Sequence, residues 1–408
     1  MKFKYEEIYA ASEDRARLLE LREALTGEGH SPESIRYFTA PGRSELGGNH
    51  TDHQHGLVLA AAVDVDTVAA AAPNDLGLVR LHSAGFPPCQ VSIRPEENPP
   101  APKESALSLL QGMVELCGAL GNPTGLDIYA SSTVLPGGGL SSSASFEVVL
   151  AELFNELWCG GRLSPIDLAK LGQRVENEWF GKPCGLLDQS ASAVGGATFM
   201  SFADPSAPVV EKLDLDLQAQ GYALFIINCG ASHADLTGEY AAIPGELKAL
   251  CRVLGKEVLA QVPEEAFYAR LPELRQRCGD RALLRAIHVY EENRRVLAQR
   301  DALRAGDFPR FLSLVRASGL SSWRFLQNVT PAGQIREQPM ALTLALAEKL
   351  LGDRGACRVH GGGFAGTAQA YVPLEMARSF RAAMEAVLGP GACQQRTVRA
   401  VGAAEILL

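Results

Sequence analysis

The sequence predicts an α+β fold of two lobes, and three observations support this prediction. The chain has 408 residues, which is more than a single hydrophobic core usually supports. Apolar residues recur with the period of strands in some segments and with the period of helices in others. The segment FADPSAPVVEKLDL, near residue 210, is rich in turn residues. We therefore expect an N-terminal lobe of residues 1–210 and a C-terminal lobe of residues 211–408.

The hydrophobic pattern predicts the elements in order. The first ~35 residues have a partly helical pattern, and residues 38–56 are expected to form a long polar loop. Apolar residues predict strands at residues 57–72 and 126–134. Helical spacing predicts helices from about Ser142 to Trp158 and from Leu168 to Trp179. Beyond these we expect a buried strand at residues 222–230, long helices through residues 240–350, and a strand–glycine loop–strand unit at residues 356–373.

Composition and charge narrow the class of protein. Apolar residues make up 47% of the chain and charged residues 21%, which is typical of a globular enzyme. A net charge of −9 disfavours a nucleic-acid partner, because backbone binding needs clustered Lys and Arg. We expect neither a secretory signal nor a transmembrane helix, since no long apolar stretch occurs. The nine cysteines form no Cys-x-x-Cys pair and are expected to be reduced thiols in a cytoplasmic protein.

A loop rich in glycine and serine follows the strand predicted at residues 126–134. Its glycines let the backbone approach a ligand closely, and the helix that follows adds unpaired N–H groups and the positive end of a dipole. These features suit a triphosphate. The alternative is a glycine-rich turn with a serine N-cap. The loop is not a Walker A motif, because no Gly-Lys-Ser/Thr follows, and the chain lacks the protein-kinase motifs.

A cluster of polar side chains occupies the loop predicted before residue 57. Its members are Arg43, Glu45, Asn49, His50, Thr51, Asp52, His53, Gln54 and His55. Such a density of hydrogen-bonding groups suits a polyhydroxylated substrate, and one carboxylate such as Asp52 can accept from two sugar hydroxyls. The histidines with Asp52 also allow a transition-metal site, which the lack of a second Cys/His cluster disfavours. A solvated loop without function is the third alternative.

These motifs, in this order, resemble those of the GHMP kinases, and specifically the galactokinase branch. PGRSELGGNHTDHQHG is similar to the pattern GRxNLIGEHTDYxxG, and LPGGGLSSSAS to the phosphate loop of the family. KPCGLLDQ is similar to PCGxMDQ and HGGGFAG to TGGGFGG, with His360 and Ala365 replacing Thr and Gly. HADLTGEY resembles the segment that ends in a sugar-contacting tyrosine. The resemblance covers nearly the whole chain and implies a two-lobed GHMP kinase architecture with the active site in the cleft between the lobes.

The resemblance implies a role for each matched residue. Asp188 would be the catalytic carboxylate that orients or deprotonates the anomeric hydroxyl, and Arg43 would hold it ionised. Ser143 and Glu176 would be the magnesium ligands. The sugar-binding residues would be Asn49, His50, Asp52, Gly185 and Tyr240. The ATP-binding residues would be Gly137, Gly138, Gly139, Leu140, Ser141, Ser142 and Ser143.

The implied activity is phosphorylation of galactose by ATP at the anomeric hydroxyl, in a monomer that uses Mg²⁺ and has no nucleic-acid or membrane partner. Two departures open an alternative: Asn49 stands where the family has Glu, and His53 where it has Tyr. An amide would tolerate a C6 carboxylate, and the His53-Gln54 pair is similar to plant galacturonate kinases, so a 1-kinase for galacturonate or another galactose-like sugar stays open. A non-catalytic sugar- and ATP-binding sensor is the third alternative, which the complete phosphate loop disfavours.

Overall fold

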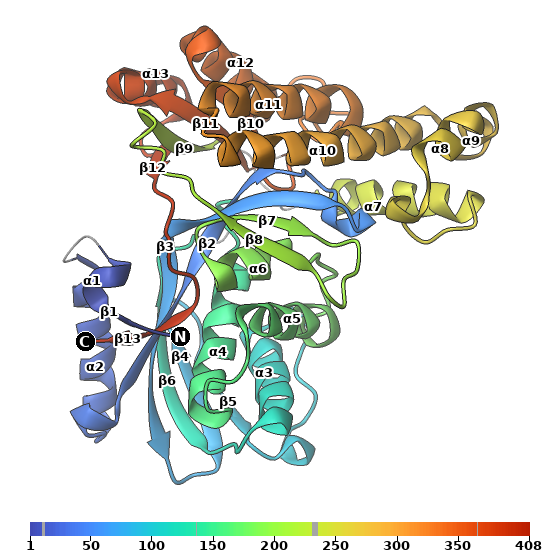
Figure 1. The fold of residues 1–408 in the computed structure, drawn as a ribbon. Coiled ribbons are helices and arrows are strands. Elements are labelled where there is room, and N and C mark those ends of the chain that lie inside the picture. Colours follow the sequence, from blue (N-terminus) through green and yellow to red (C-terminus); the bar gives the residue numbers. More distant parts are fainter. Residues whose placement is uncertain (10–12, 136, 231–235, 365) are drawn as a thin grey trace.

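Two sheets organise the protein. The computed structural model describes residues 1–9, 13–135, 137–230, 236–364 and 366–408. Within these residues a nine-stranded sheet forms a large lobe and a four-stranded sheet forms a small lobe, stacked on it in the view of Figure 1. The mixed helices and strands and the two lobes agree with the α+β fold that the sequence predicts.

The elements have the following bounds. The strands are β1 (Lys2–Lys4), β2 (Arg36–Gly47), β3 (Leu57–Asn74), β4 (Leu78–Ser83), β5 (Cys89–Ser92), β6 (Gly125–Ser132), β7 (Ala197–Ser201), β8 (Val209–Leu213), β9 (Tyr222–Asn228), β10 (Ala356–Val359), β11 (Thr367–Pro373), β12 (Cys393–Arg396) and β13 (Ala404–Leu407). The helices are α1 (Tyr5–Ile8), α2 (Glu13–Gly27), α3 (Ala106–Leu120), α4 (Ser142–Trp158), α5 (Pro165–Val175), α6 (Leu187–Val194), α7 (Thr237–Val253), α8 (Glu264–Ala269), α9 (Leu271–Cys278), α10 (Asp280–Arg304), α11 (Phe308–Ser321), α12 (Pro339–Leu351) and α13 (Ala377–Leu388). Two π-helical turns, η4 (Glu176–Phe180) and η6 (Ser322–Leu326), continue α5 and α11.

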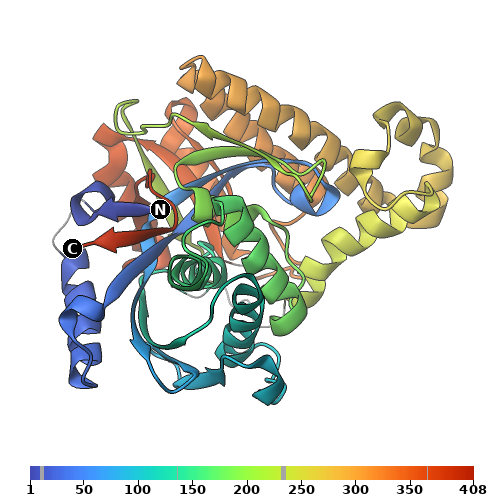
Figure 2. The same ribbon diagram turned by 60° about the horizontal axis from the view of Figure 1, so that its bottom comes forward.

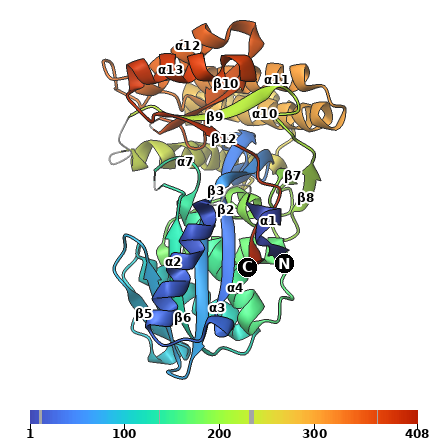
Figure 3. The ribbon, with the colours of Figure 1, turned by 90° about the vertical axis from the view of Figure 1, so that its left-hand side faces the viewer.

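Strand β3 is the centre of the large lobe. It pairs with β2 on one edge, and on the other edge with β7 near its start and with β6 near its end. Its side chains alternate between two faces, because successive residues of a strand point in opposite directions. Val68, Ala70 and Ala72 pack in the core beneath α2, whereas Ala69 and Ala71 pack in the core of α3 and α4. Figures 2 and 3 show α2, with the short α1 near it, on one side of the sheet and α3 and α4 on the other.

In the small lobe, the side chains of β9 also alternate between the two faces of the sheet. Its sheet has the order β10-β11-β9-β12, and every pairing is antiparallel. Phe225 and Ile227 pack on the side of α12 and α13, whereas Leu224 and Ile226 pack on the side of α11. Helices α7, α8 and α9 pack against α10 in a separate cluster, at the right-hand end of this lobe in Figure 1. Throughout the described part of the chain, each helix is too short or too polar to span a bilayer.

The chain crosses between the lobes more than once. Position 210, where we predicted the boundary, lies inside β8, which pairs with β7 of the large sheet. After the small lobe the chain returns, and β13 inserts between β1 and β2 of the large sheet. The division at residue 210 stays a prediction, and residues 404–407 lie with the large lobe in this structure.

Most of the predicted elements are confirmed, and one is wrong. The strand expected at residues 57–72 is β3, the helix expected from Ser142 to Trp158 is α4, and the strand–glycine loop–strand unit is β10, the loop and β11. The loop expected at residues 38–56 is wrong for its first half, because Arg36–Gly47 is strand β2. This strand carries two register shifts, between Pro41 and Arg43 and between Glu45 and Gly47, which interrupt the alternating pattern.

Asp66, at the middle of β3, ties the ends of the chain to the large sheet. Its side chain is about 2% exposed and accepts hydrogen bonds from Arg17 (2.8 Å), Arg399 (2.8 Å), Thr39 (2.7 Å) and Tyr9 (2.6 Å). Burial alone would raise the pKa of Asp66, but the charges of Arg399 and Arg17 outweigh it and hold the pKa below its ordinary value.

We expect Asp66→Asn to lower the free energy of unfolding by about 3–5 kcal/mol, because the buried Arg399 and the partly buried Arg17 lose their anionic partner. Since the folded-state pKa is lowered, the contribution of Asp66 is present above the ordinary carboxyl pKa of about 4 and is lost as the pH falls through the folded-state value. Urea denaturation followed by circular dichroism measures the difference in the free energy of unfolding between the variant and the unmodified protein, at neutral and at acid pH. The exposed Asp75→Asn is the control, and equal stability of the two variants at neutral pH would contradict the prediction.

Candidate active site

Arg43 joins three segments that are far apart in the sequence. It lies on β2, and its Nε and Nη2 donate to Oδ1 and Oδ2 of Asp188 at 2.6 and 2.7 Å. Its Nη1 donates to the carbonyl of Gly139, in the glycine–serine loop, at 2.6 Å. A bidentate guanidinium–carboxylate pair is strong and directional. Arg43 therefore fixes the position of Asp188 relative to the loop.

Asp188 lies in the first turn of α6 and stays accessible while it is paired. About 36% of its side chain is exposed, and the Ser141 hydroxyl donates to its Oδ2. Burial would raise the pKa of Asp188, but the charge of Arg43 and the hydrogen bonds from Arg43 and Ser141 lower it below its usual value. The carboxylate is therefore ionised at neutral pH. Such a group accepts a hydrogen bond from an incoming hydroxyl well, but it is a weak base for removing the whole proton.

The glycine–serine loop is held from both sides. The backbone N–H of Arg43 donates to the carbonyl of Leu140 at 3.0 Å, and Ser141 has a left-handed conformation with φ 57° directly before α4. On the other side, a Cβ at Gly139 would lie 2.1 Å from Oγ1 of Thr367, so a side chain there would collide with the small lobe. Gly139 also has φ +72°, which favours glycine. The loop thus presents its backbone at the junction of the two lobes.

The two predicted magnesium ligands lie together. The Ser143 hydroxyl is 3.2 Å from Oε1 of Glu176, which begins the π-helical turn η4 and is about 2% exposed. Nζ of Lys182 is 3.4 Å from the same oxygen. The other oxygen of Glu176 accepts from Nε2 of Gln189 at 2.9 Å. π-turns inside helices are frequent at functional sites, and here the turn starts at the carboxylate.

Three residues of this region were not identified from the sequence: Glu147, Lys182 and Gln189. Gln189 also donates to Oε2 of Glu147 at 2.9 Å, so one amide bridges two carboxyl groups. The Oε1 of Glu147 is buried without a hydrogen-bond partner among the described residues. Burial, and then the charge of Glu176, raise the pKa of Glu147 well above its usual value. Signals did exist: Glu147 follows Ser143 by one helical turn, and Gln189 and Lys182 lie within KPCGLLDQ.

Asp52 and Gly185 are in direct contact. A Cβ at Gly185 would lie 1.9 Å from Oδ2 of Asp52, so the Asp52 carboxylate occupies the space that a side chain would need. The other oxygen of Asp52 accepts from the backbone N–H of His53 at 2.9 Å. The side chain of Asp52 is about 13% exposed. The structure thus brings these two predicted sugar-binding residues together.

His50 and Tyr240 both reach the C-terminal glycine loop, Gly361–Gly363. Nε2 of His50 donates to the carbonyl of Gly362 at 3.1 Å, and the Tyr240 hydroxyl donates to the carbonyl of Gly363 at 3.0 Å. Burial, and then the neighbouring His53, lower the pKa of His50 to about 4, so the ring is neutral at physiological pH. These two residues come from different lobes, and the glycine loop joins them.

Asn49, which is expected to bind the sugar, makes its hydrogen bonds within the protein. Its side chain is fully buried, and its Nδ2 donates to Oε1 of Glu45 at 3.1 Å and to the carbonyl of Gly361 at 2.7 Å. Its Oδ1 accepts from Asn328 at 2.8 Å and from Ser322 at 3.2 Å. Each hydrogen-bonding position of the amide is therefore already used by the protein. The acceptors for the amide nitrogen, Glu45 and the Gly361 carbonyl, thus lie inside the protein.

Parts of the quoted motifs lie outside the described residues. These are Pro136 of the phosphate loop, His233–Asp235 of HADLTGEY and Ala365 of HGGGFAG.

In the described part of the chain, an open cavity of about 340 Å³ lies between α3 and η4, and Gln111, Glu178 and Trp179 are among the residues that line it. The lining contains none of the predicted site residues.

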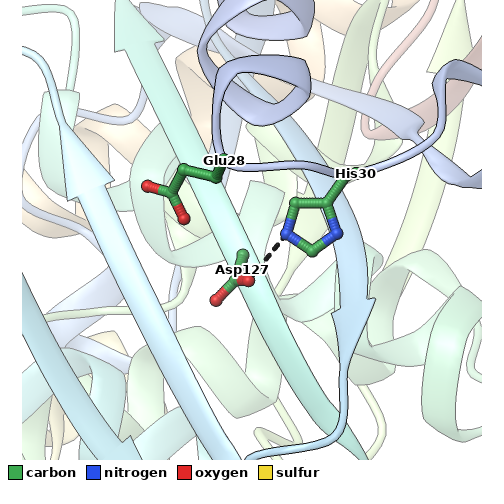
Figure 4. A group of neighbouring side chains, drawn as sticks. All are labelled: Glu28, His30 and Asp127. Carbon is green, nitrogen blue, oxygen red and sulfur yellow. Dashed lines mark hydrogen bonds and ion pairs between the residues drawn. The ribbon is translucent and has the colours of Figure 1, made fainter.

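The structure does not support a histidine metal site. Among the described residues, the group with metal-ligand side chains in close proximity is Glu28, His30 and Asp127, next to the end of α2 (Figure 4). Arg80 donates to both oxygens of Asp127, at 2.5 and 2.6 Å, and also to Glu28 at 3.1 Å. A guanidinium inside the group repels a cation. We interpret the group as an ion-pair cluster that fastens α2 to β4 and β6.

The comparisons with known proteins agree with this geometry. Residues 108–196 match the family model of the GHMP kinases N terminal domain, and residues 27–73 match the galactokinase galactose-binding signature. A galactokinase of Streptomyces coelicolor is 35% identical over 347 residues, which are 83% of this chain and 84% of that relative.

Solved structures show the same relationship. The structure of Lactococcus lactis galactokinase complexed with galactose matches with a TM-score of 0.80 and 26% identity, over 96% of this chain and 100% of that chain. Methanococcus jannaschii mevalonate kinase, 14% identical with a TM-score of 0.61 over 89% of this chain and 98% of its own, shares the fold. The expected family and its two-lobed architecture are confirmed. This chain belongs to the GHMP kinase family, in its galactokinase branch.

Proposed function

We propose that this protein transfers the γ-phosphoryl group of ATP to the anomeric hydroxyl of galactose and so forms galactose 1-phosphate. The observation that carries the proposal is the pair of Arg43 and Asp188 at the edge of the phosphate loop. Arg43 binds both the Asp188 carboxylate and the Gly139 carbonyl, so the group that would receive the sugar hydroxyl is fixed beside the loop that would hold the phosphates. The galactokinases from Streptomyces coelicolor and Lactococcus lactis support galactose as the sugar.

Asp188 would act mainly by orientation and charge. Its ionised carboxylate accepts a hydrogen bond from the anomeric hydroxyl and turns the hydroxyl oxygen toward the γ-phosphorus. The new oxygen–phosphorus bond forms as the bond to ADP breaks, and the hydroxyl proton passes to the Asp188 carboxylate late in this process. Because Arg43 lowers the pKa of Asp188, full proton abstraction early in the reaction is unfavourable. Transfers with such loose transition states depend chiefly on positioning and charge stabilisation.

The residues around Ser143 fit a magnesium ion. A hydroxyl oxygen and a carboxylate oxygen lie 3.2 Å apart, and oxygen ligands of this kind suit Mg²⁺. The nearby Oε1 of Glu147, buried without a partner among the described residues, adds an oxygen that is free to interact. Ser143 and Glu176 would hold the ion, and Gln189 would fix the second oxygen of Glu176. When bound, Mg²⁺ would neutralise charge on the phosphates.

The placement of Asn49 favours a neutral sugar. The galacturonate alternative required that the Asn49 amide face C6 of the sugar. In the structure this amide is fully buried, and its nearest acidic neighbour, Glu45, brings a carboxylate to within 3.1 Å of it. An amide that bonds to protein groups at both its nitrogen and its oxygen has no group left to receive a C6 carboxylate. We therefore propose galactose, with a sugar and ATP as the small-molecule partners.

A coupled ADP-release assay on a panel of sugars tests the substrate. With galactose, galacturonate, arabinose, glucose and N-acetylgalactosamine, we expect the highest kcat/KM for galactose, and phosphorus NMR should identify a sugar 1-phosphate. Turnover with galacturonate but not galactose would overturn the choice of sugar. Binding of sugar and ATP with no ADP release on any sugar would overturn the catalytic function and indicate a sensor.

Asp188→Asn tests the catalytic assignment. We expect kcat to fall by about 10²–10³-fold, because the neutral amide neither attracts the hydroxyl proton nor balances the charge of Arg43. Calorimetric binding of galactose and circular dichroism should stay close to those of the unmodified protein. Asp75→Asn serves as the matched control. A kcat of Asp188→Asn within about threefold of that of the control would show that Asp188 is not the catalytic carboxylate.

Glu176→Gln tests the metal assignment. We expect Mg²⁺-dependent binding of a non-hydrolysable ATP analogue, measured by calorimetry without sugar, to weaken about 10–100-fold. The matched control is Glu178→Gln, in the same π-helical turn, whose side chain is 53% exposed and pairs with Arg174. If both variants bind the analogue with the same dependence on Mg²⁺, Glu176 is not a ligand.

A further inference from the structure

Three successive carbonyls of the C-terminal glycine loop each accept a hydrogen bond from a predicted sugar-binding residue. Asn49 donates to Gly361 at 2.7 Å, His50 to Gly362 at 3.1 Å and Tyr240 to Gly363 at 3.0 Å. Asn328 adds a second donor to the Gly362 carbonyl at 3.2 Å. The loop is thus held by side chains from the segment after β2, from α7 and from the segment after η6.

The orientation of the Asn49 amide is fixed by its partners. The Glu45 carboxylate and the Gly361 carbonyl are acceptors, so they face Nδ2, and the Asn328 amide and the Ser322 hydroxyl donate to Oδ1. A carboxylate at position 49 would donate no hydrogen bond to Gly361 and would place its oxygens against the carboxyl oxygens of Glu45. An amide is therefore the group that satisfies all four neighbours.

Glu45 is itself anchored. Its Oε1 accepts from Nη2 of Arg358 at 2.5 Å, and the Arg358 side chain is fully buried. Its backbone N–H donates to Nε2 of His360 at 3.3 Å, and its carbonyl accepts from Gln369 at 3.1 Å. Glu45 is thus bound to β10 and β11, the strands on either side of the glycine loop. It is in place to orient Asn49 toward Gly361.

The sequence carries an independent sign of the same pairing. The family pattern GRxNLIGEHTDYxxG places Asn at the position of Glu45 and Glu at the position of Asn49. In this chain the acid and the amide are exchanged, and the two side chains are in hydrogen-bond contact. The exchange keeps one acid and one amide, and it moves the hydrogen-bond donor to position 49.

We infer that Asn49, oriented by Glu45, is a positioning residue: its amide fixes the Gly361 carbonyl, and thereby sets the loop that His50 and Tyr240 contact for binding of the sugar. Asn49 acts through the loop and does not touch the sugar. The inference deepens the proposed function and rests on it for the identity of the sugar. It separates two roles: the Glu45 side chain pairs with Arg358, whereas the hydrogen-bond donor at position 49 holds the loop.

Three isosteric variants test the inference. Asn49→Asp removes the donor, so we expect KM for galactose to rise about 10–100-fold while KM for ATP stays within about twofold. Glu45→Gln keeps an acceptor for Asn49, so KM for galactose should stay within about threefold although the melting temperature falls. Glu45→Gln/Asn49→Asp restores a donor–acceptor pair between positions 45 and 49 and returns one negative charge. Its melting temperature should recover relative to Asn49→Asp, while KM for galactose stays high because Gly361 still lacks its donor.

The controls make the result decisive. Asn122→Asp, at an exposed site, should change neither KM for galactose nor the melting temperature. An unchanged KM for galactose in Asn49→Asp would overturn the inference, and so would a double variant in which KM recovers together with the melting temperature. Hydrogen–deuterium exchange of residues 361–364 needs no turnover, and it should be faster in Asn49→Asp and in the double variant. If the unmodified protein phosphorylates no sugar, the proposed function fails, and the exchange rates still test the position of the loop.

Discussion

The contact between Arg43 and Asp188 is the constraint on which the site depends. Strand β2, helix α6 and the phosphate loop are separate in sequence. The guanidinium of Arg43, on β2, donates to Asp188 of α6 and to the Gly139 carbonyl of the loop. Because each of the three guanidinium nitrogens of Arg43 donates a hydrogen bond, a shift in any of the three segments would break a charge-assisted bond. The same contact sets the electrostatic state of Asp188. Geometry and protonation state at the proposed reaction centre therefore have a common origin.

Buried acids elsewhere in the structure follow the same rule. Glu45 pairs with Arg358 and Asp66 with Arg399, since a buried carboxylate is stable only when its charge is balanced. Glu147 has the amide of Gln189 as its side-chain partner, and burial raises the pKa of Glu147 well above its usual value. Burial also raises the pKa of Glu45, to about 7, although the charge of Arg358 opposes this shift. The same Gln189 amide donates to Glu176. Lys182 then supplies the positive charge on the other side of Glu176.

Local patterns predicted much of the fold, and long-range contacts account for the rest. Strand β3 and helix α4 have regular apolar spacing and were predicted at nearly their observed bounds. Strand β2 was missed because its bulges interrupt the alternation. In the site, Ser143 and Glu176 lie 3.2 Å apart, and their role as magnesium ligands stays a prediction. The inward orientation of Asn49 could not be predicted, because it depends on Asn328 and Gly361, about 300 positions away.

The late return of β13 to the large sheet has a consequence for synthesis of the chain. Until residues 399–407 leave the ribosome, β2 lacks its neighbour, and Asp66 lacks one of its cations. The nascent large lobe therefore presents an unpaired strand edge while the whole small lobe is being translated. A stop codon placed just before β13 would leave that edge permanently open to association with other chains. Pairing of β13 with β2 therefore closes this edge only after the small lobe has been synthesised.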